Sequence, residues 1–293
     1  MMPIDSKYPE LRRRRFRQIP VRLLVPNVIT LLAICAGLTA IRLSTEGRME
    51  LAVAAIVFAA ALDGIDGRIA RLIKGQSKFG AELDSLADFV NFGVAPGLIL
   101  YFWQLHELGN GGWIAAMVFA ISGGLRLARF NASIDDPNKP AFAANYFTGV
   151  PAPAGAITVL LPVYLGFLGI TTPPTMLTAF YTLLIAFLMV SRLPVFSGKT
   201  MRMRVPPEML LPVFVSVVFF IALLVSYPWH ILSAGSVLYL ISLPWGWKTY
   251  RDHARAAEAQ AAVPAGAPTS ATPSPSYPGV ADADHDDRPA RLN

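Results

Sequence analysis

Eight long apolar segments limit what this chain can fold into more than any other feature. They run over residues 23–43, 51–73, 79–104, 112–130, 150–170, 174–192, 208–226 and 229–247. Most of them approach the ~20 residues that a helix needs to cross ~30 Å of hydrocarbon. The chain is 54% hydrophobic and only 15% charged, which is too apolar for an ordinary soluble domain. The sequence therefore predicts an all-α fold, a polytopic membrane helical bundle with about eight transmembrane helices.

The distribution of basic residues predicts how this bundle is oriented. If the N-terminus is cytoplasmic, all but two of the 25 lysines and arginines fall in parts of the chain that are also cytoplasmic, the exceptions being Arg42 and Arg48. Cytoplasmic loops are enriched in these residues, so both termini are expected in the cytoplasm. The net charge of +6 could suggest a nucleic-acid partner. The basic residues lie beside apolar segments, however, so the expected partner is the lipid bilayer and not nucleic acid.

Composition divides the chain into three regions. Residues 1–20 form a basic arm, predicted to keep the N-terminus cytoplasmic or to rest on anionic headgroups as an interfacial helix. Residues 21–250 are expected to form the transmembrane domain, and no cleavable signal peptide is evident before it. Residues 251–293 are rich in Ala, Pro and Ser and are predicted to be a disordered cytoplasmic tail. The single cysteine, Cys35, excludes an intramolecular disulfide and a cysteine-built zinc site.

Four aspartates lie inside the second and third apolar segments, where an ionised side chain costs roughly 3 to more than 10 kcal/mol. Asp63 and Asp66 are three residues apart, and Asp84 and Asp88 are four apart, so each pair shares one face of a helix. A short loop near residues 75–77 makes the two helices antiparallel. Counting from this loop places Asp66 level with Asp84, and Asp63 level with Asp88 at greater depth. The spacing therefore predicts four carboxylates converging below the cytoplasmic surface.

Such a cluster cannot be fully ionised without counter-charge. Two divalent cations would balance four carboxylates, and ligand sets made of oxygen favour Mg²⁺, Mn²⁺ or Ca²⁺ over zinc. Protein-bound Mg²⁺ is commonly completed by substrate phosphates, which implies a substrate that carries phosphate. Gly67 and Gly80 lack side chains beside the acids, so a ligand could approach closely there. Arg71 is positioned to hold a phosphate.

Two other interpretations of the acids stay open. They could be polar helix-packing contacts paired with Arg68, Arg71 or Arg126, although three cations balance four acids poorly. They could instead belong to an ion-coupled transporter, which would distribute its acids across the membrane. Here the acids gather near one face, and the last four apolar segments contain almost no ionisable residues, so the sequence favours the metal site.

One run of residues resembles, without a gap or substitution, the signature of the CDP-alcohol phosphatidyltransferase family: Asp63-x2-Asp66-Gly67-x2-Ala70-Arg71-x8-Gly80-x3-Asp84-x3-Asp88. Three neighbouring stretches, residues 78–96, 125–131 and 147–153, are similar to one branch of the family, the bacterial membrane-type phosphatidylserine synthases. Members of the family transfer the phosphatidyl group of CDP-diacylglycerol to an alcohol and release CMP. The eight predicted spans also fit this branch better than the six-span core of the family.

The resemblance implies CDP-diacylglycerol and L-serine as substrates and phosphatidylserine as the product of phospholipid biosynthesis. It also implies a homodimer in the cell membrane, a bacterial inner membrane, with the active site facing the cytoplasm. Glycerol 3-phosphate, inositol phosphate and choline remain alternative acceptors within the same family.

The resemblance further implies a role for each site residue. Two Mg²⁺ or Mn²⁺ ions would be held by Asp63, Asp66, Asp84 and Asp88, with Asp88 also acting as the general base. The CDP moiety would be bound by Gly67, Arg71 and Gly80. Arg126, Arg129 and Asn131 end the fourth apolar segment on the same side of the membrane. These three either anchor that segment at the cytoplasmic face or bind a phosphate or the serine carboxylate.

Overall fold

The computed structural model describes residues 21–73, 77–133, 146–170, 172–191, 193–196 and 209–261. The regular secondary structure of these residues is helical apart from one short two-stranded sheet, which confirms the predicted helical class. The basic arm at residues 1–20, most of the loop at 75–77 and most of the predicted tail at 251–293 lie outside the described residues. All of the candidate site residues belong to the first of the two units into which the chain divides, Met1–His253.

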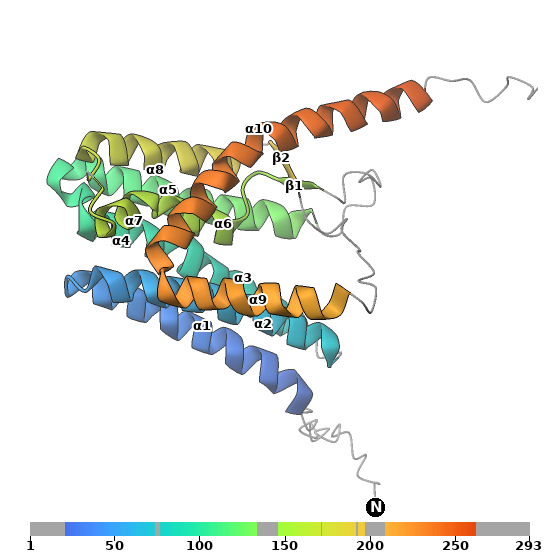
Figure 1. The fold of residues 1–293 in the computed structure, drawn as a ribbon, viewed down its shortest axis with the longest axis horizontal. Helices are drawn as coiled ribbons and strands as arrows, with labels where there is room; N and C mark the ends of the chain where they lie inside the picture. The colour runs from blue at the N-terminus through green and yellow to red at the C-terminus, as the bar shows by residue number, and fades with distance from the viewer. Residues whose placement is uncertain are drawn as a thin grey trace, which may run out of the picture. The chain divides into compact units, whose positions relative to one another are not determined.

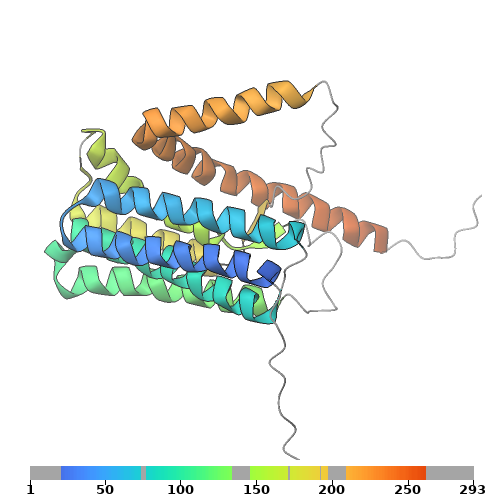
Figure 2. The ribbon, with the colours of Figure 1, turned by 90° about the horizontal axis from the view of Figure 1, so that it is seen from below.

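The first two helices form an antiparallel hairpin. Helix α1 spans Val21–Thr45 and helix α2 spans Met49–Leu72. Between them lies Gly47, whose φ of +75° is a conformation that favours glycine. The two helices lie side by side in both ribbon views (Figures 1 and 2). Alanines are prominent among their buried residues, including Ala33, Ala40 and Ala52, and small side chains of this kind let membrane helices approach closely.

The third apolar segment is one continuous run with a widened turn in its middle. It consists of α3 (Lys78–Asp88), the π-helix η1 (Phe89–Val94) and α4 (Ala95–Trp103). The hydroxyl of Ser77 caps α3 by accepting a hydrogen bond from the Gly80 N–H at 2.9 Å. In the first turn of α4, Pro96 has no amide hydrogen, and its ring would clash with a carbonyl one regular turn earlier. The π-turn accommodates this proline, and it begins directly after Asp88.

Helix α5 (Asn110–Ala132) follows the short 3-10 helix η2 (Leu105–Leu108) and packs against this run through glycines. A Cβ atom added at Gly123 would lie 2.9 Å from the Cα of Gly93. One added at Gly97 would lie 2.9 Å from the carbonyl oxygen of Ala116. Both distances are too short for a Cβ atom, so the close contact between the third segment and α5 depends on glycine at these positions.

The following segment is interrupted. Residues 150–170, predicted as one span, form two short helices, α6 (Ala152–Val159) and α7 (Leu161–Phe167). Pro162 lies in the first turn of α7, where proline is tolerated, whereas it would disrupt the interior of one long helix. Helix α8 (Thr175–Val190) follows. Strands β1 (Tyr146–Thr148) and β2 (Pro194–Phe196) pair antiparallel, with Phe147 opposite Val195, and so join the chain before α6 to the chain after α8.

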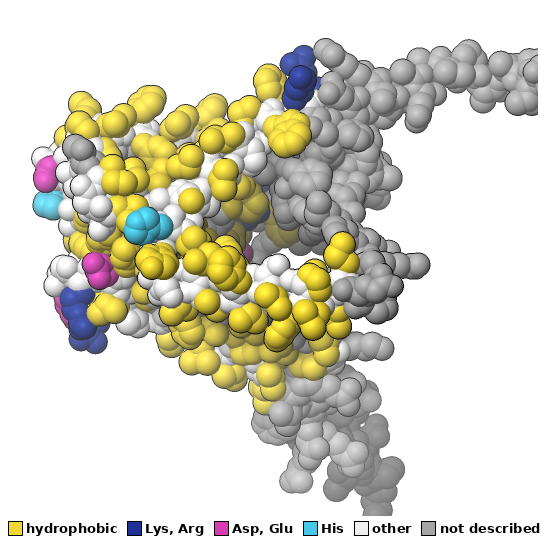
Figure 3. Space-filling model, in the orientation of Figure 1, with side chains coloured by type: hydrophobic (Ala, Val, Ile, Leu, Met, Phe, Trp, Pro, Cys, Tyr) yellow, Lys and Arg dark blue, Asp and Glu magenta, His cyan; other side chains and the backbone are white. Residues whose placement is uncertain are grey.

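The last two helices, α9 (Leu210–Ser226) and α10 (Pro228–Ala261), meet at an angle of 115°. Within the described part of the chain α9 has no buried residue, which suits a helix surrounded by lipid. The start of α10 contacts the bundle through Trp229, whose ring packs against those of Tyr164 and Phe167. Hydrophobic side chains predominate among the coloured residues in Figure 3, and the charged side chains visible there lie toward the ends of the coloured region.

Among the described residues, three helical stretches are long and apolar enough to cross a membrane: Leu24–Thr45, Lys78–Trp103 and Asn110–Ala132. A fourth is added if α9 and the residues from Pro228 to Lys248 count as one bent span. These stretches support a helical membrane protein. The number of eight spans and the cytoplasmic position of both termini stay predictions.

Candidate metal and substrate site

Helices α2 and α3 bring the aspartates together, as their spacing predicts. One carboxylate oxygen from each of Asp63, Asp66 and Asp84 lies within 4.8 Å of the other two. The carboxyl group of Asp88 is within hydrogen-bonding reach of that of Asp63, which agrees with the predicted pairing of these two at one depth. Asp84 interacts electrostatically with both Asp63 and Asp66, so the predicted pair of Asp66 and Asp84 is part of one larger cluster.

Two oxygens of the cluster lack a partner that their burial requires. The Oδ1 atoms of Asp66 and Asp88 are buried and accept no hydrogen bond from the described residues. The other oxygen of Asp66 accepts a hydrogen bond of 2.7 Å from the Thr30 hydroxyl, and Asp66 is only 2% exposed. Buried carboxylates without compensating charge are strongly disfavoured. Because the donors are all carboxylate oxygens, the cluster of Asp63, Asp66 and Asp84 fits a hard divalent cation.

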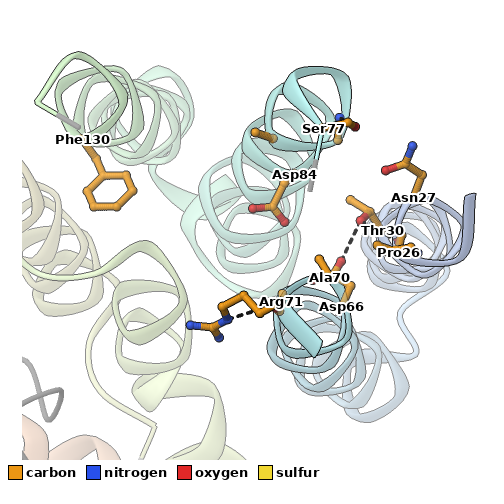
Figure 4. A pocket seen from close by; sticks show the side chains of 12 residues that line it. Pro26, Asn27, Thr30, Asp66, Ala70, Arg71, Ser77, Asp84 and Phe130 are labelled. Carbon is orange, nitrogen blue, oxygen red and sulfur yellow. Dashed lines mark hydrogen bonds between the residues drawn. The ribbon is translucent and has the colours of Figure 1, made fainter. Parts of the chain in front are cut away.

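A cavity of about 500 Å³ lies beside the cluster (Figure 4). Its lining includes five residues that the sequence analysis had selected: Asp66, Gly67, Arg71, Gly80 and Asp84. The first helix and the chain around α3 and α5 supply further lining residues, among them Pro26, Asn27, Thr30, Ser77 and Phe130. Two of the clustered aspartates, Asp66 and Asp84, therefore line the same cavity as the residues expected to bind the CDP moiety.

The two glycines of the cavity have different surroundings. A Cβ atom at Gly80 would lie 2.8 Å from Oδ1 of Asn27 and 3.1 Å from Oγ of Ser77, so glycine allows α3 to approach α1 here. A Cβ atom at Gly67 would meet nothing within 4 Å, so this glycine leaves open space beside Asp66. Arg71 donates a hydrogen bond of 2.9 Å from Nε to the Gly67 carbonyl, and this bond keeps its Nε beside α2.

The three candidates at the end of α5 have different surroundings. Arg126 is 8% exposed, interacts electrostatically with Asp88, and places its guanidinium 5.7 Å from the ring centre of Phe130. Arg129 instead donates a hydrogen bond of 2.6 Å to the Val190 carbonyl at the end of α8. Asn131 donates one of 2.9 Å to the Ser85 hydroxyl on α3. Of the three, the structure directs Arg126 toward the acids and engages the other two in contacts between helices.

Sequence reasoning did not identify the contribution of α1 to the site. Asn27 directly follows Pro26, and Thr30 comes three residues later, so the two share a helix face in a largely apolar segment. The Thr30 hydroxyl lies 2.7 Å from an Asp66 oxygen and 3.1 Å from the Pro26 carbonyl oxygen, and the shorter distance makes Asp66 the main acceptor of its one hydrogen. This bond orients the Asp66 carboxylate from outside the motif. Two polar residues on one face of an apolar span were the available signal for this role.

Carboxylates that could hold a divalent cation thus lie beside a cavity within a bundle of apolar helices, as in a candidate metal site of a membrane protein. Residues 23–191 match the family described as CDP-alcohol phosphatidyltransferase. Residues 208–244 match a second model, described as CDP-alcohol phosphatidyltransferase 2. The chain belongs to the CDP-alcohol phosphatidyltransferase family, whose members generally use divalent metals.

Several curated relatives share one name, CDP-diacylglycerol–serine O-phosphatidyltransferase. The protein of Mycobacterium leprae is 39% identical over 236 residues, which cover 80% of this chain and 77% of the relative. That of Helicobacter pylori strain 26695 is 36% identical over 222 residues, or 74% of this chain and 88% of the relative. That of Mycobacterium tuberculosis strain H37Rv is 50% identical, but over 137 residues, which span about half of each chain, 47% and 48%.

Proposed function

We propose that this protein transfers the phosphatidyl group of CDP-diacylglycerol to the hydroxyl of L-serine, forming phosphatidylserine and CMP. One observation carries the proposal: Asp63, Asp66 and Asp84 converge within 4.8 Å beside the cavity of about 500 Å³ that Gly67, Arg71 and Gly80 line. Relatives that match 74% to 80% of this chain bear the name of this activity, which favours serine over the other acceptor alcohols of the family.

We assign two Mg²⁺ or Mn²⁺ ions to Asp63, Asp66, Asp84 and Asp88, because two divalent cations balance four carboxylates. When bound, such ions neutralise the diphosphate and stabilise the departing CMP. Gly67 leaves room for the CDP moiety, and Arg71 offers its guanidinium to a phosphate. Thr30 keeps Asp66 oriented through its hydrogen bond of 2.7 Å.

Asp88 acts as the general base in this proposal. Its free Oδ1 accepts the proton of the serine hydroxyl while the serine oxygen forms a bond to the β-phosphorus and the bond from that phosphorus to the CMP oxygen breaks. Arg126 interacts electrostatically with Asp88 and is the best placed of the three basic and polar candidates to bind the acceptor or a phosphate. Arg129 and Asn131 position α5 against α8 and α3 through their hydrogen bonds.

We further propose the topology that places the site within reach of both substrates. Eight spans with both termini in the cytoplasm would put the acids near the cytoplasmic face of a cell membrane, a bacterial inner membrane. There a lipid and a water-soluble amino acid can meet. The basic arm at 1–20, the catalytic domain at 21–250 and the tail at 251–293 would be its three parts, assembled as a homodimer.

The proposal is tested by measuring CMP release from the purified full-length protein. The assay contains CDP-diacylglycerol in detergent micelles, Mn²⁺ or Mg²⁺, and either L-serine, glycerol 3-phosphate, inositol phosphate or choline. We expect release that requires both the metal and serine, with phosphatidylserine formed in equal amount.

Two results would contradict the proposal at different levels. Release that depends on another of these alcohols but not on serine would replace the acceptor and keep the enzyme class. No release with any alcohol, in protein that still binds a CDP nucleotide, would reject the phosphatidyl transfer itself.

A further inference from the structure

Arg126 is a buried cation that interacts electrostatically with Asp88. Arg126 is 8% exposed. Among the described residues, no carboxylate forms an ion pair with its guanidinium, and no acceptor forms a hydrogen bond with it. Its recorded contact is the ring of Phe130, at 5.7 Å, and Phe130 itself lines the cavity beside Asp84. A buried charge is retained only when it is compensated. Asp88 interacts electrostatically with Arg126, and the donors of the guanidinium that form no hydrogen bond with the described residues can bind a further anion.

Tyr239, near the C-terminal end of the membrane helices, carries an unpartnered hydroxyl close enough to Arg126 to interact with it electrostatically. The hydroxyl of Tyr239 on α10 is buried, accepts and donates no hydrogen bond among the described residues, and interacts electrostatically with Arg126. Ser233 and Ser236, earlier on the same helix, also carry buried hydroxyls without a partner in the described part of the chain. Buried polar groups are normally hydrogen-bonded, so a row of three on one helix points to a polar ligand or water along this face.

Asp88 completes the arrangement. Its Oδ1 is buried and free, and Arg126 interacts with both Asp88 and Tyr239. Three helices, α3, α5 and α10, thus direct an acceptor, a cation and a hydroxyl donor toward one another. An amino alcohol with a carboxylate has matching groups, because only two carbon atoms separate the hydroxyl of serine from its carboxylate.

We propose that Tyr239 and Arg126 together form a subsite for an oxyanion, and that in the transfer reaction the carboxylate of the acceptor occupies it. Tyr239 is then a specificity-determining residue, donating its hydroxyl hydrogen to the carboxylate while Arg126 supplies the charge. This inference rests on the proposed function, since it assumes serine as the acceptor. It assigns a role in acceptor choice to the last helix, which lies outside the residues 23–191 that match the main family model.

The test uses the full-length protein with Tyr239→Phe, which removes one hydroxyl and keeps the ring. Tyr227→Phe is the matched control, because Tyr227 lies just before α10 and is 58% exposed. CMP release is measured with L-serine and with serinol, in which a hydroxymethyl group replaces the carboxylate. KM is determined separately for each acceptor and for CDP-diacylglycerol.

We expect Tyr239→Phe to raise the KM for serine by about tenfold to a hundredfold, the cost of a hydrogen bond to a charged group. The KM for CDP-diacylglycerol and the rate with serinol should stay at their values in the unaltered protein, which also shows that the variant is folded. Preference for serine over serinol should fall by the same factor. Tyr227→Phe should change none of these values.

Other outcomes overturn the inference. An unchanged KM for serine and an unchanged preference over serinol would remove Tyr239 from the acceptor site. A raised KM for CDP-diacylglycerol with that for serine unchanged would mean that a lipid phosphate occupies the subsite. If the unaltered protein releases no CMP with serine, the proposed function fails first, and the inference fails with it.

Discussion

Gly64 and Gly67 lie one turn apart on α2, and replacing each with alanine separates an effect on the helix from an effect on the site. A Cβ atom at either position would meet no atom within 4 Å. Gly67 lines the cavity beside Asp66, whereas Gly64 is not among its lining residues. The two substitutions therefore make the same change to the backbone and differ in what the new methyl group faces.

The expected magnitudes follow from this difference. Alanine is favoured over glycine in the interior of a helix by about 1 kcal/mol, so both variants should be slightly more stable than the parent protein. For a chain of this size the gain corresponds to a rise in Tm of about 2 °C. At Gly67 the methyl group would also occupy space intended for the CDP moiety, and overpacking of this kind costs about 1–3 kcal/mol. Affinity for the nucleotide should then fall by roughly fivefold to a hundredfold.

Thermal denaturation in detergent and the KM for CDP-diacylglycerol report on the two effects separately. We expect Gly67→Ala to raise Tm and raise this KM, and Gly64→Ala to raise Tm alone. A normal KM in Gly67→Ala would refute the assignment of the CDP moiety to the space beside Gly67. An equal rise of KM in Gly64→Ala would attribute the effect to the helix and not to the cavity.

Three further predictions concern the acids and the end of α5. Asp88→Asn should abolish turnover while CDP binding stays measurable by calorimetry, and retained turnover would remove Asp88 as the base. Thr30→Val removes the hydrogen bond of 2.7 Å to buried Asp66, so activity should require a metal concentration about tenfold higher or more, and an unchanged metal titration would contradict this. Arg129→Met should lower Tm without changing the KM for serine, because its bond of 2.6 Å goes to the Val190 carbonyl, and a raised KM would return Arg129 to the substrate site.

The convergence of the acids could be predicted from the sequence because it depends on local geometry. Asp63 and Asp66 share a face of α2, and a short connection makes α3 antiparallel to it, so Asp84 must come near both. Helical period and loop length are sufficient to predict these positions, even when the remaining fold is unknown. The same local relation places Gly67 and Gly80 in one cavity.

Other contacts between helices could not be predicted in this way. That Thr30 of α1 reaches Asp66 of α2 depends on how the two helices of the first hairpin are rotated against each other, and apolar periodicity does not specify this rotation. The end of α5 illustrates the same limit, since Arg126 and Arg129 look alike in sequence. The structure directs one toward Asp88 and the other toward the Val190 carbonyl on α8. The bend of 115° between α9 and α10 likewise could not be predicted from the number of apolar residues in each segment.

The π-turn after Asp88 lets a single transmembrane segment face two partners, α2 before the turn and α5 after it. Before this turn, α3 directs Asp84 and Asp88 toward α2, and after it Gly93 and Gly97 lie against α5. One additional residue in a helical turn rotates every later side chain by about 100° relative to an unbroken α-helix. Without it, the glycines and the acids could not both keep these orientations. Because Pro96 is incompatible with a regular turn before it, the sequence itself maintains the rotation, and the acids stay aligned while the rest of the segment remains packed on α5.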